Sequence, residues 1–187
     1  MKIILLNGPP GCGKDTLAEL FVCDFIAAPA SFKERLIAIT LTIYGVSRPL
    51  WDAWYAEDKE YPRPSLDGKS CREALIFVSE EVIKPKFGED YFGKVAAQKA
   101  LDNLRDGYKY TIFSDSGFPE EAKPLCDLVG PENVMVVRME REGTDFNNDS
   151  RRYLWADDLP EGVRFVYIDN DGLPEDMLRG LKKEVLV

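Results

Sequence analysis

The sequence contains no histidine, and its cysteines are few and widely spaced: Cys12, Cys23, Cys71 and Cys126. Structural zinc sites are built from histidines and closely spaced cysteine pairs, so this composition argues against one. Disulfides are not expected in a reducing compartment. Without histidine, any proton accepted from a substrate near neutral pH would fall to an aspartate or a glutamate.

Long apolar stretches are also missing. The sequence has no run of 18 apolar residues, so no membrane-spanning helix and no membrane partner are expected. The N-terminal stretch "MKIILLN" is too short for the apolar part of a signal peptide. We therefore expect a cytoplasmic protein, and 187 residues are enough for one domain with its own core.

Positive charge is scarce, because 24 Lys and Arg residues stand against 33 Asp and Glu residues, for a net charge of −9. A nucleic-acid-binding protein usually presents a basic face, so the composition predicts no nucleic-acid partner. A small anionic ligand is not excluded, since it needs only a few cations in one place.

A glycine-rich loop, "GPPGCGKDT" at residues 8–16, lies between an apolar run and a segment with helical periodicity. Glycine permits backbone angles that turn successive N–H groups inward, and the following helix N-terminus adds positive dipole character. The spacing G-x4-G-K in a strand–loop–helix context is the P-loop pattern, which binds phosphate. Asp15 stands where the general pattern has Ser or Thr, and the hydroxyl follows at Thr16.

Apolar strands alternate with amphipathic helices along most of the chain, which predicts an α/β fold: a parallel sheet flanked by helices, with ligands at the carboxyl ends of the strands. A proline- and aromatic-rich stretch at 45–70 is expected to be mobile or irregular, with some helix. The expected strands are 2–7, 110–115, 133–139 and 163–170, and the expected helices are 14–27, 32–44, 71–83, 88–107, 119–129 and 173–186.

The loop resembles that of the P-loop nucleoside monophosphate kinases, which carry G-x-P-G-x-G-K-x-T, and its Lys-Asp-Thr version most resembles bacteriophage deoxynucleoside monophosphate kinases. Further segments agree in order along nearly the whole chain: "SFKERL", "CREAL", "KFGEDYFGK", "FSDSGFPEEA", "VVRMEREG" and "VYIDNDG". The resemblance implies a single P-loop kinase domain, with a mobile monophosphate-binding segment at about 31–70 and a lid at about 141–160. A phage protein would work in the host cytoplasm.

The resemblance also implies the cofactors ATP and Mg²⁺ and a nucleoside monophosphate substrate. For the donor nucleotide it implies Gly11, Gly13, Lys14, Asp15 and Thr16 at the phosphates and Asn170 near the adenine, with Thr16 and Asp115 on Mg²⁺. For the acceptor monophosphate it implies Arg35 and Arg72, with Lys33 beside them, and Trp54 is a candidate for stacking on the acceptor base because aromatic faces stack on nucleobases. The groups it implies for charge neutralisation during transfer are Lys14, Arg72, Arg141 and Arg151, with Arg152 as the alternative to Arg151.

Plainer interpretations stay open for several of these residues. Asp115 is also a favoured helix cap, Trp54 and its aromatic neighbours could close a small core, and the arginines could be solvated. Gly117 stands where related phage kinases often have an arginine, so one phosphate contact could be missing or displaced. The missing histidine slightly favours an acceptor that is already anionic, because such an acceptor needs no base.

Two other functions remain open. One is a small-metabolite P-loop kinase that acts on a sugar acid or on phosphomevalonate. The other is a non-catalytic nucleotide-binding module. The sequence leaves the oligomeric state open, a homodimer included.

Overall fold

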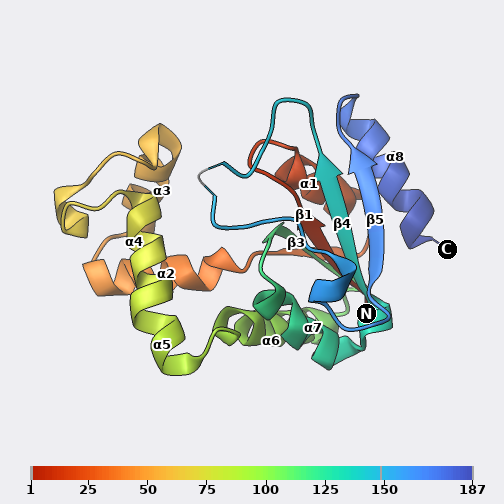
Figure 1. The fold of residues 1–187 in the computed structure, drawn as a ribbon, viewed down its shortest axis with the longest axis horizontal. Helices are drawn as coiled ribbons and strands as arrows, with labels where there is room; N and C mark the ends of the chain where they lie inside the picture. Colours follow the sequence, from red (N-terminus) through yellow and green to blue (C-terminus); the bar gives the residue numbers. More distant parts are fainter. Residues whose placement is uncertain (1, 148, 187) are drawn as a thin grey trace. The chain divides into compact units, whose positions relative to one another are not determined.

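Five strands form one parallel sheet in the computed structural model, which describes residues 2–147 and 149–186. The order across the sheet is β2-β3-β1-β4-β5, and Figure 1 labels β1, β3, β4 and β5. The strands are β1 (Lys2–Asn7), β2 (Ala27–Ala30), β3 (Tyr110–Ser116), β4 (Val134–Glu140) and β5 (Arg164–Asp169). Helices connect the strands, so the predicted α/β fold with a parallel sheet is confirmed.

Each face of the sheet is covered by two helices, because side chains alternate along the strands. Ile4, Leu6 and Val137 share a core with α1 (Lys14–Asp24) and α8 (Pro174–Val185). On the opposite face, Ile3, Leu5 and Val136 share a core with α6 (Tyr91–Arg105) and α7 (Pro119–Val129). The strands are apolar toward both faces, as expected for a buried parallel sheet.

The chain packs as two units. The sheet unit comprises the residues up to Phe32 and those from Gly93 onward, and the helical unit comprises Lys33–Phe92, coloured orange to green in Figure 1. The helical unit has its own core around Trp51, Leu66 and Ala74. Its elements are α2 (Lys33–Tyr44), α3 (Arg48–Asp58), the 3₁₀ turn η1 (Pro64–Leu66), α4 (Cys71–Phe77), the π-helical turn η2 (Val78–Ile83) and α5 (Lys84–Phe87).

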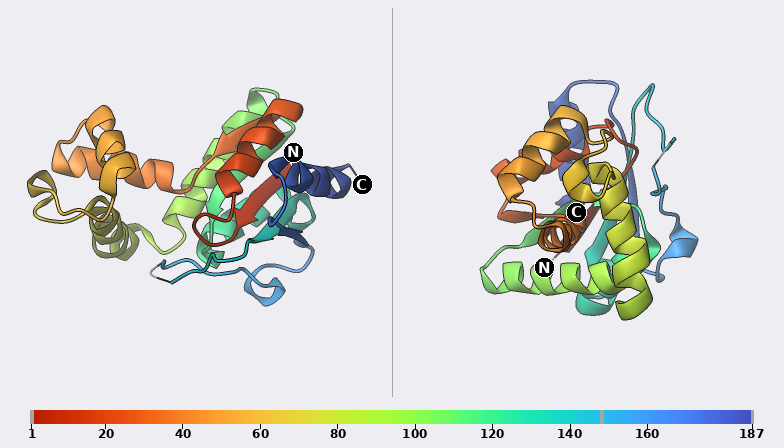
Figure 2. Two further views of the ribbon diagram at one scale, coloured as in Figure 1. Left: turned by 90° about the horizontal axis from the view of Figure 1, so that it is seen from above. Right: turned by 90° about the vertical axis from the view of Figure 1, so that its left-hand side faces the viewer.

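The segment between β4 and β5 contains no long element. Figure 2 shows it, in cyan and light blue, as an extended loop that ends in the 3₁₀ turn η4 (Ala156–Asp158). Asn148, inside the predicted lid at 141–160, lies outside the described residues. Another 3₁₀ turn, η3 (Pro131–Asn133), precedes β4. In the described part of the chain no helix combines the length and apolarity needed to cross a membrane.

Two regions differ from the sequence-based expectation. The predicted helix 14–27 ends at Asp24, and Ala27–Ala30 forms a strand that the sequence analysis missed. This strand contains Pro29, which a sheet tolerates because β2 is an edge strand. The helix that begins at Cys71 continues through a π-helical turn as far as Phe87 instead of ending near Ile83. The stretch 45–70, predicted as irregular with some helix, does contain a helix, α3, whose Trp51 is buried.

Candidate active site

The loop between β1 and α1 has the conformation that the P-loop pattern predicts. Gly13 caps α1 with φ of +98°, in the left-handed region. A Cβ atom there would lie 2.4 Å from Nδ2 of Asn170, and a Cβ at Gly8 would lie 2.5 Å from the carbonyl oxygen of Met139. Only glycine fits both positions, so the loop packs tightly while its N–H groups remain at a helix N-terminus.

Lys14 points back into this loop and is 7% exposed. Its Nζ donates to the carbonyl oxygens of Gly8 at 2.7 Å and Pro9 at 2.6 Å. Burial lowers the pKa of Lys14, the neighbouring Cys12 opposes this effect, and the positive charge of Arg151 lowers the pKa further. A buried ammonium group next to a second cation is stabilised by an anion, so this arrangement favours phosphate binding.

Arg151 is held beside the loop by a bidentate ion pair with Asp149, at 2.9 Å for Nε and 2.7 Å for Nη2. Its side chain lies directly over Gly117, where an added Cβ would be 2.5 Å from the Cβ of Arg151. The missing side chain at Gly117 therefore leaves the space that Arg151 occupies. The structure thus places a guanidinium group near the loop from a different segment of the chain.

The other arginines of this segment differ in their surroundings. Arg141 donates from Nη1 to the carbonyl oxygen of Gly11, at 3.3 Å. Arg152 forms a bidentate pair with Asp158, at 2.7 and 2.6 Å. This pair raises the pKa of Arg152 and lowers that of Asp158. Both adjacent arginines therefore form bidentate pairs with an aspartate, and they differ in that the positive charge of Arg151 acts on Lys14.

Asp115 lies at the carboxyl end of β3 and is 6% exposed. Its carboxylate accepts hydrogen bonds from the hydroxyl of Ser31 at 2.6 Å and from the N–H of Phe32 at 3.0 Å. The predicted role as a cap of the next helix is wrong, because α7 has Phe118 as its N-cap and no side-chain cap hydrogen bond. Asp115 instead orders the chain just before α2. Its position at the edge of the sheet that carries the P-loop is also compatible with a role at a metal ion.

The residues present fit a magnesium–nucleotide complex. Mg²⁺ is usually held by one or two carboxylates, substrate phosphates and water, so a dense protein cage is not needed. Within residues 2–147 and 149–186 no group of three or more His, Cys, Asp or Glu side chains could hold a metal. Thr16 is exposed in the first turn of α1 and Asp115 lies at the end of β3, so both are suitable partners. Asp15 is likewise exposed in that turn.

Asn170, predicted near the adenine, follows β5 and braces the P-loop. Its Nδ2 donates to the carbonyl oxygen of Cys12 at 2.9 Å, and its backbone N–H donates to the carbonyl oxygen of Glu140 at 2.8 Å. The side chain of Asn170 lies against Gly13, because a Cβ atom added at Gly13 would lie 2.4 Å from Nδ2 of Asn170. One donor of the amide is therefore committed to the loop itself.

Sequence analysis missed Asn7, which is fully buried at the end of β1. Its Nδ2 donates to the carbonyl oxygens of Ser116 at 3.2 Å and Arg152 at 2.9 Å, and its Oδ1 accepts from the N–H of Leu154 at 2.8 Å. Asn7 thus ties the arginine-bearing segment to the sheet. The available signal was a polar residue that ends an otherwise apolar strand.

Arg138 was missed as well. It is 5% exposed in β4, and its guanidinium carbon lies 3.9 Å from the ring centroid of Trp155, 4.3 Å from that of Tyr153 and 5.1 Å from that of Tyr167. A cation over aromatic faces is favourable when desolvated. Together with Asn7, this stack anchors the base of the segment that presents Arg151.

The acceptor candidates all belong to the helical unit. Lys33 and Arg35 are exposed in the first turn of α2. Arg72 pairs through Nε with the carboxylate of Glu60 at 2.6 Å. Trp54 packs against the core of this unit, in line with the small-core interpretation.

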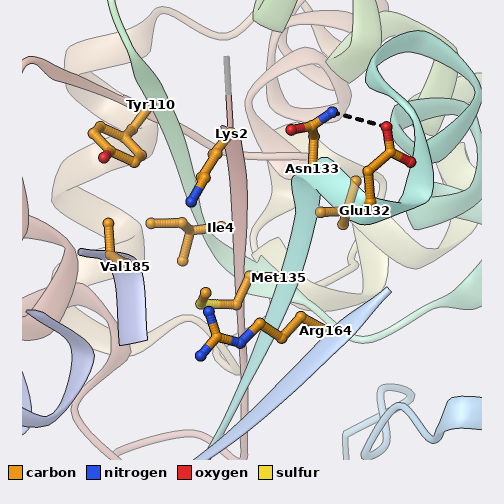
Figure 3. Close-up of a pocket in the computed structure, with 9 residues that line it drawn as sticks. Lys2, Ile4, Tyr110, Glu132, Asn133, Met135, Arg164 and Val185 are labelled. Atoms are coloured by element: carbon orange, nitrogen blue, oxygen red, sulfur yellow. Dashed lines mark hydrogen bonds between the residues drawn. The ribbon is translucent and has the colours of Figure 1, made fainter. Parts of the chain in front are cut away.

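A small pocket of about 50 Å³ lies at the amino ends of the strands, away from the P-loop at their carboxyl ends. Figure 3 shows Lys2, Tyr110, Met135 and Arg164 around it, where the strands begin. Ligand pockets usually span about 300–1,000 Å³. A nucleotide would not fit there, so the loop edge remains the candidate site.

No protein-family model and no curated protein sequence matches this chain. Among solved structures, it is similar to an unliganded sugar kinase from Janibacter sp. HTCC2649, with a TM-score of 0.52 and 11% identity over 100% of this chain and 95% of the other. It is also similar to a protein from Chloroflexus aurantiacus described as a kinase, with a TM-score of 0.51 and 13% identity over 99% and 96%. At such identities the likeness concerns the fold, so the chain has the α/β fold of P-loop kinases.

Proposed function

We propose that the protein is a phosphotransferase that moves the γ-phosphoryl group of ATP to a small molecule. The observation that carries this proposal is the buried ammonium of Lys14 inside a P-loop, with the positive charge of Arg151 acting on it. Such a cationic centre would suit the charge on the phosphoryl group during transfer. A nucleotide-binding module without activity would need no cations for an acceptor, whereas this chain has Lys33, Arg35 and Arg72 in the helical unit.

In the transfer, an oxygen of the acceptor forms a bond to the γ-phosphorus while the bond to the bridging oxygen of ADP breaks. Lys14 and the N–H groups from Gly11 to Lys14 would hold the donor phosphates, and Arg151 and Arg141 would neutralise charge on the transferring group. Thr16 and Asp115 would hold Mg²⁺, which when bound neutralises charge on the donor phosphates. Arg138 and Asn7 keep the segment of Arg151 in place.

Two acceptor classes differ in their support. A sugar acid or similar small metabolite is supported by a structure of the same fold that is described as a sugar kinase. A deoxynucleoside monophosphate is supported by the motif resemblance and by Lys33, Arg35, Trp54 and Arg72 in the helical unit. The comparisons favour the small metabolite. A hydroxyl acceptor would need a carboxylate to take its proton, whereas a phosphate acceptor would not.

The test is an acceptor panel. The full chain is incubated with ATP and Mg²⁺ and with gluconate, glucose, phosphomevalonate or each common ribo- and deoxyribonucleoside monophosphate, and the phosphorylated products are separated by chromatography. We expect one acceptor class to be phosphorylated and Lys14→Ala to lower turnover by orders of magnitude, with an unchanged circular dichroism spectrum. Binding of ATP without transfer to any acceptor, or near-normal turnover of Lys14→Ala, would contradict the proposal.

A further inference from the structure

Arg63, in the loop between α3 and α4, has surroundings that its sequence context does not reveal. Its guanidinium carbon lies 4.8 Å from the ring centroid of Tyr61 and 5.5 Å from that of Trp54. Its side chain is only 15% exposed. Aromatic faces on a guanidinium restrict its plane, so the donors of Arg63 point in set directions.

The backbone around Arg63 is ordered by hydrogen bonds. Its N–H donates to the carbonyl oxygen of Lys69 at 2.9 Å, and its carbonyl oxygen accepts from the N–H groups of Leu66 at 2.9 Å and Gly68 at 3.1 Å. Leu66 is fully buried in the core of the helical unit, which anchors this turn. Arg63 is therefore a positioned side chain rather than a solvated one.

The hydrogen-bonding capacity of Arg63 is only partly used. Its Nε is buried and has no hydrogen-bond partner in the described part of the chain. Its Nη2 pairs at 3.1 Å with Glu57, whose side chain is 72% exposed. Arg72 also pairs with an exposed carboxylate, because its Nε lies 2.6 Å from Glu60, which is 54% exposed. Exposed ion pairs contribute little, so an incoming anion can replace either glutamate at small cost.

Backbone hydrogen bonds hold the chain around Arg63 against the chain around Arg72. The N–H of Arg63 donates to the carbonyl oxygen of Lys69 at 2.9 Å, and the N–H of Arg72 donates to the carbonyl oxygen of Lys59 at 3.2 Å. Two guanidinium groups, each paired with a displaceable carboxylate, therefore lie around the start of α4. Planar guanidinium groups bind the oxygens of phosphate and carboxylate in pairs.

We propose that Arg63 is an acceptor-binding residue and that, together with Arg72, it holds an anionic oxygen group of the acceptor in place of Glu57 and Glu60. The acceptor is then a phosphate monoester or a carboxylate, not a neutral sugar. This inference rests on the proposed phosphotransferase function and specifies the substrate class. Trp54 and Tyr61 hold the plane of the guanidinium of Arg63 and offer an apolar face beside it.

The test compares kinetics of full-length variants with an anionic acceptor. Loss of a charge-assisted hydrogen bond in Arg63→Gln should raise the KM for the acceptor roughly 10- to 100-fold while the KM for ATP stays unchanged. The acceptor KM of Arg63→Lys should lie between those of the wild type and Arg63→Gln, because lysine keeps the charge but lacks the planar guanidinium group. Glu57→Gln should lower the acceptor KM, by up to about fivefold, because it removes the competing carboxylate. A purely structural role of Arg63 would not produce that gain.

Arg48 is the matched control. It is an exposed arginine of the same unit, paired with Glu34 and Asp52, so Arg48→Gln should leave both KM values unchanged. Gluconate and deoxythymidine monophosphate distinguish a carboxylate from a phosphate, and glucose is the neutral comparison. Equal use of glucose and the anions would overturn the inference. So would an Arg63→Gln variant with a lower melting temperature but an unchanged acceptor KM.

A failure of the proposed function would be visible separately. If the wild type phosphorylates no acceptor, calorimetric titration with gluconate, deoxythymidine monophosphate, inorganic phosphate and glucose still tests Arg63 directly. Tighter binding of an anion by the wild type than by Arg63→Gln supports the anion site. Equal binding by both proteins overturns it.

Discussion

Replacing Gly117 by alanine should reduce catalysis by displacing Arg151. The added Cβ would lie 2.5 Å from the Cβ of Arg151 and 2.7 Å from its Cγ, whereas ordinary van der Waals contact begins at 3.4 Å. The two segments must therefore separate by about 0.9 Å. A misplacement of about 1 Å at a reacting centre can cost about 100-fold in rate, so we expect Gly117→Ala to lower kcat by about that factor.

The assay is steady-state kinetics at saturating ATP and acceptor, with thermal unfolding measured in parallel. Gly180→Ala is the matched control, because a Cβ at Gly180 meets only Ile168 Cδ1, at 4.0 Å. This control should keep full activity. The melting temperature of Gly117→Ala should stay close to that of the wild type, since Gly117 and Arg151 both lie outside the helices and strands.

A double variant tests whether Gly117→Ala lowers kcat through Arg151 or independently of it. Arg151→Ala should also lower kcat by about 100-fold or more, and Gly117→Ala should add little to it, because both changes remove the same interaction. Wild-type kcat in Gly117→Ala, or full additivity of the two losses, would refute the role assigned to Arg151. A loss of activity that merely follows a loss of folded protein would refute it as well.

Two further predictions concern stability. Asn7→Ala leaves the buried N–H of Leu154 without its acceptor, so the free energy of unfolding in urea should fall by about 1–3 kcal/mol. The control, Asn147→Ala on the exposed loop, should change it by less than about 0.5 kcal/mol. Equal effects of the two substitutions would contradict the anchoring role of Asn7. Burial raises the pKa of Cys126 to about 11 from 9.0. The stability that the neutral thiol contributes is therefore fully present below pH 9 and is lost as the pH rises toward 11. Stability should fall over that window by about 2–3 kcal/mol more in the wild type than in Cys126→Ala, whereas the exposed Cys23→Ala should behave like the wild type; identical pH profiles for all three proteins would refute the assignment.

The P-loop could be predicted from the sequence because its determinants are local. The order of Gly8, Gly11, Gly13 and Lys14 after an apolar strand is sufficient, since the required backbone angles and N–H directions follow from residue type. The parallel sheet was predictable for a similar reason, because apolar strands that alternate with amphipathic helices leave few other arrangements. The capping box of Ser70 and Glu73 that the structure shows is also local, since its two partners are three residues apart.

Local pattern was misleading where a neighbouring strand decides the conformation. The segment Ala27–Ala30 has alanine and proline, which do not favour strands, and becomes a strand only because β3 offers it an edge. The stretch around Trp51 was predicted as irregular with some helix, because its prolines hid where the helix lies. Its helix forms over a small core that Leu66 and Ala74, distant in sequence, complete.

The sequence alone therefore determined that this chain has a P-loop on a parallel α/β sheet, and it provided the set of candidate cations. Only the tertiary structure decided which of them bear on the site. Arg151 and Arg152 are adjacent and chemically identical, yet one is held over Gly117 near Lys14 and the other pairs with Asp158. Asn7, Arg138 and Arg63 gain their roles from partners that folding brings to them, and residue type does not encode those contacts.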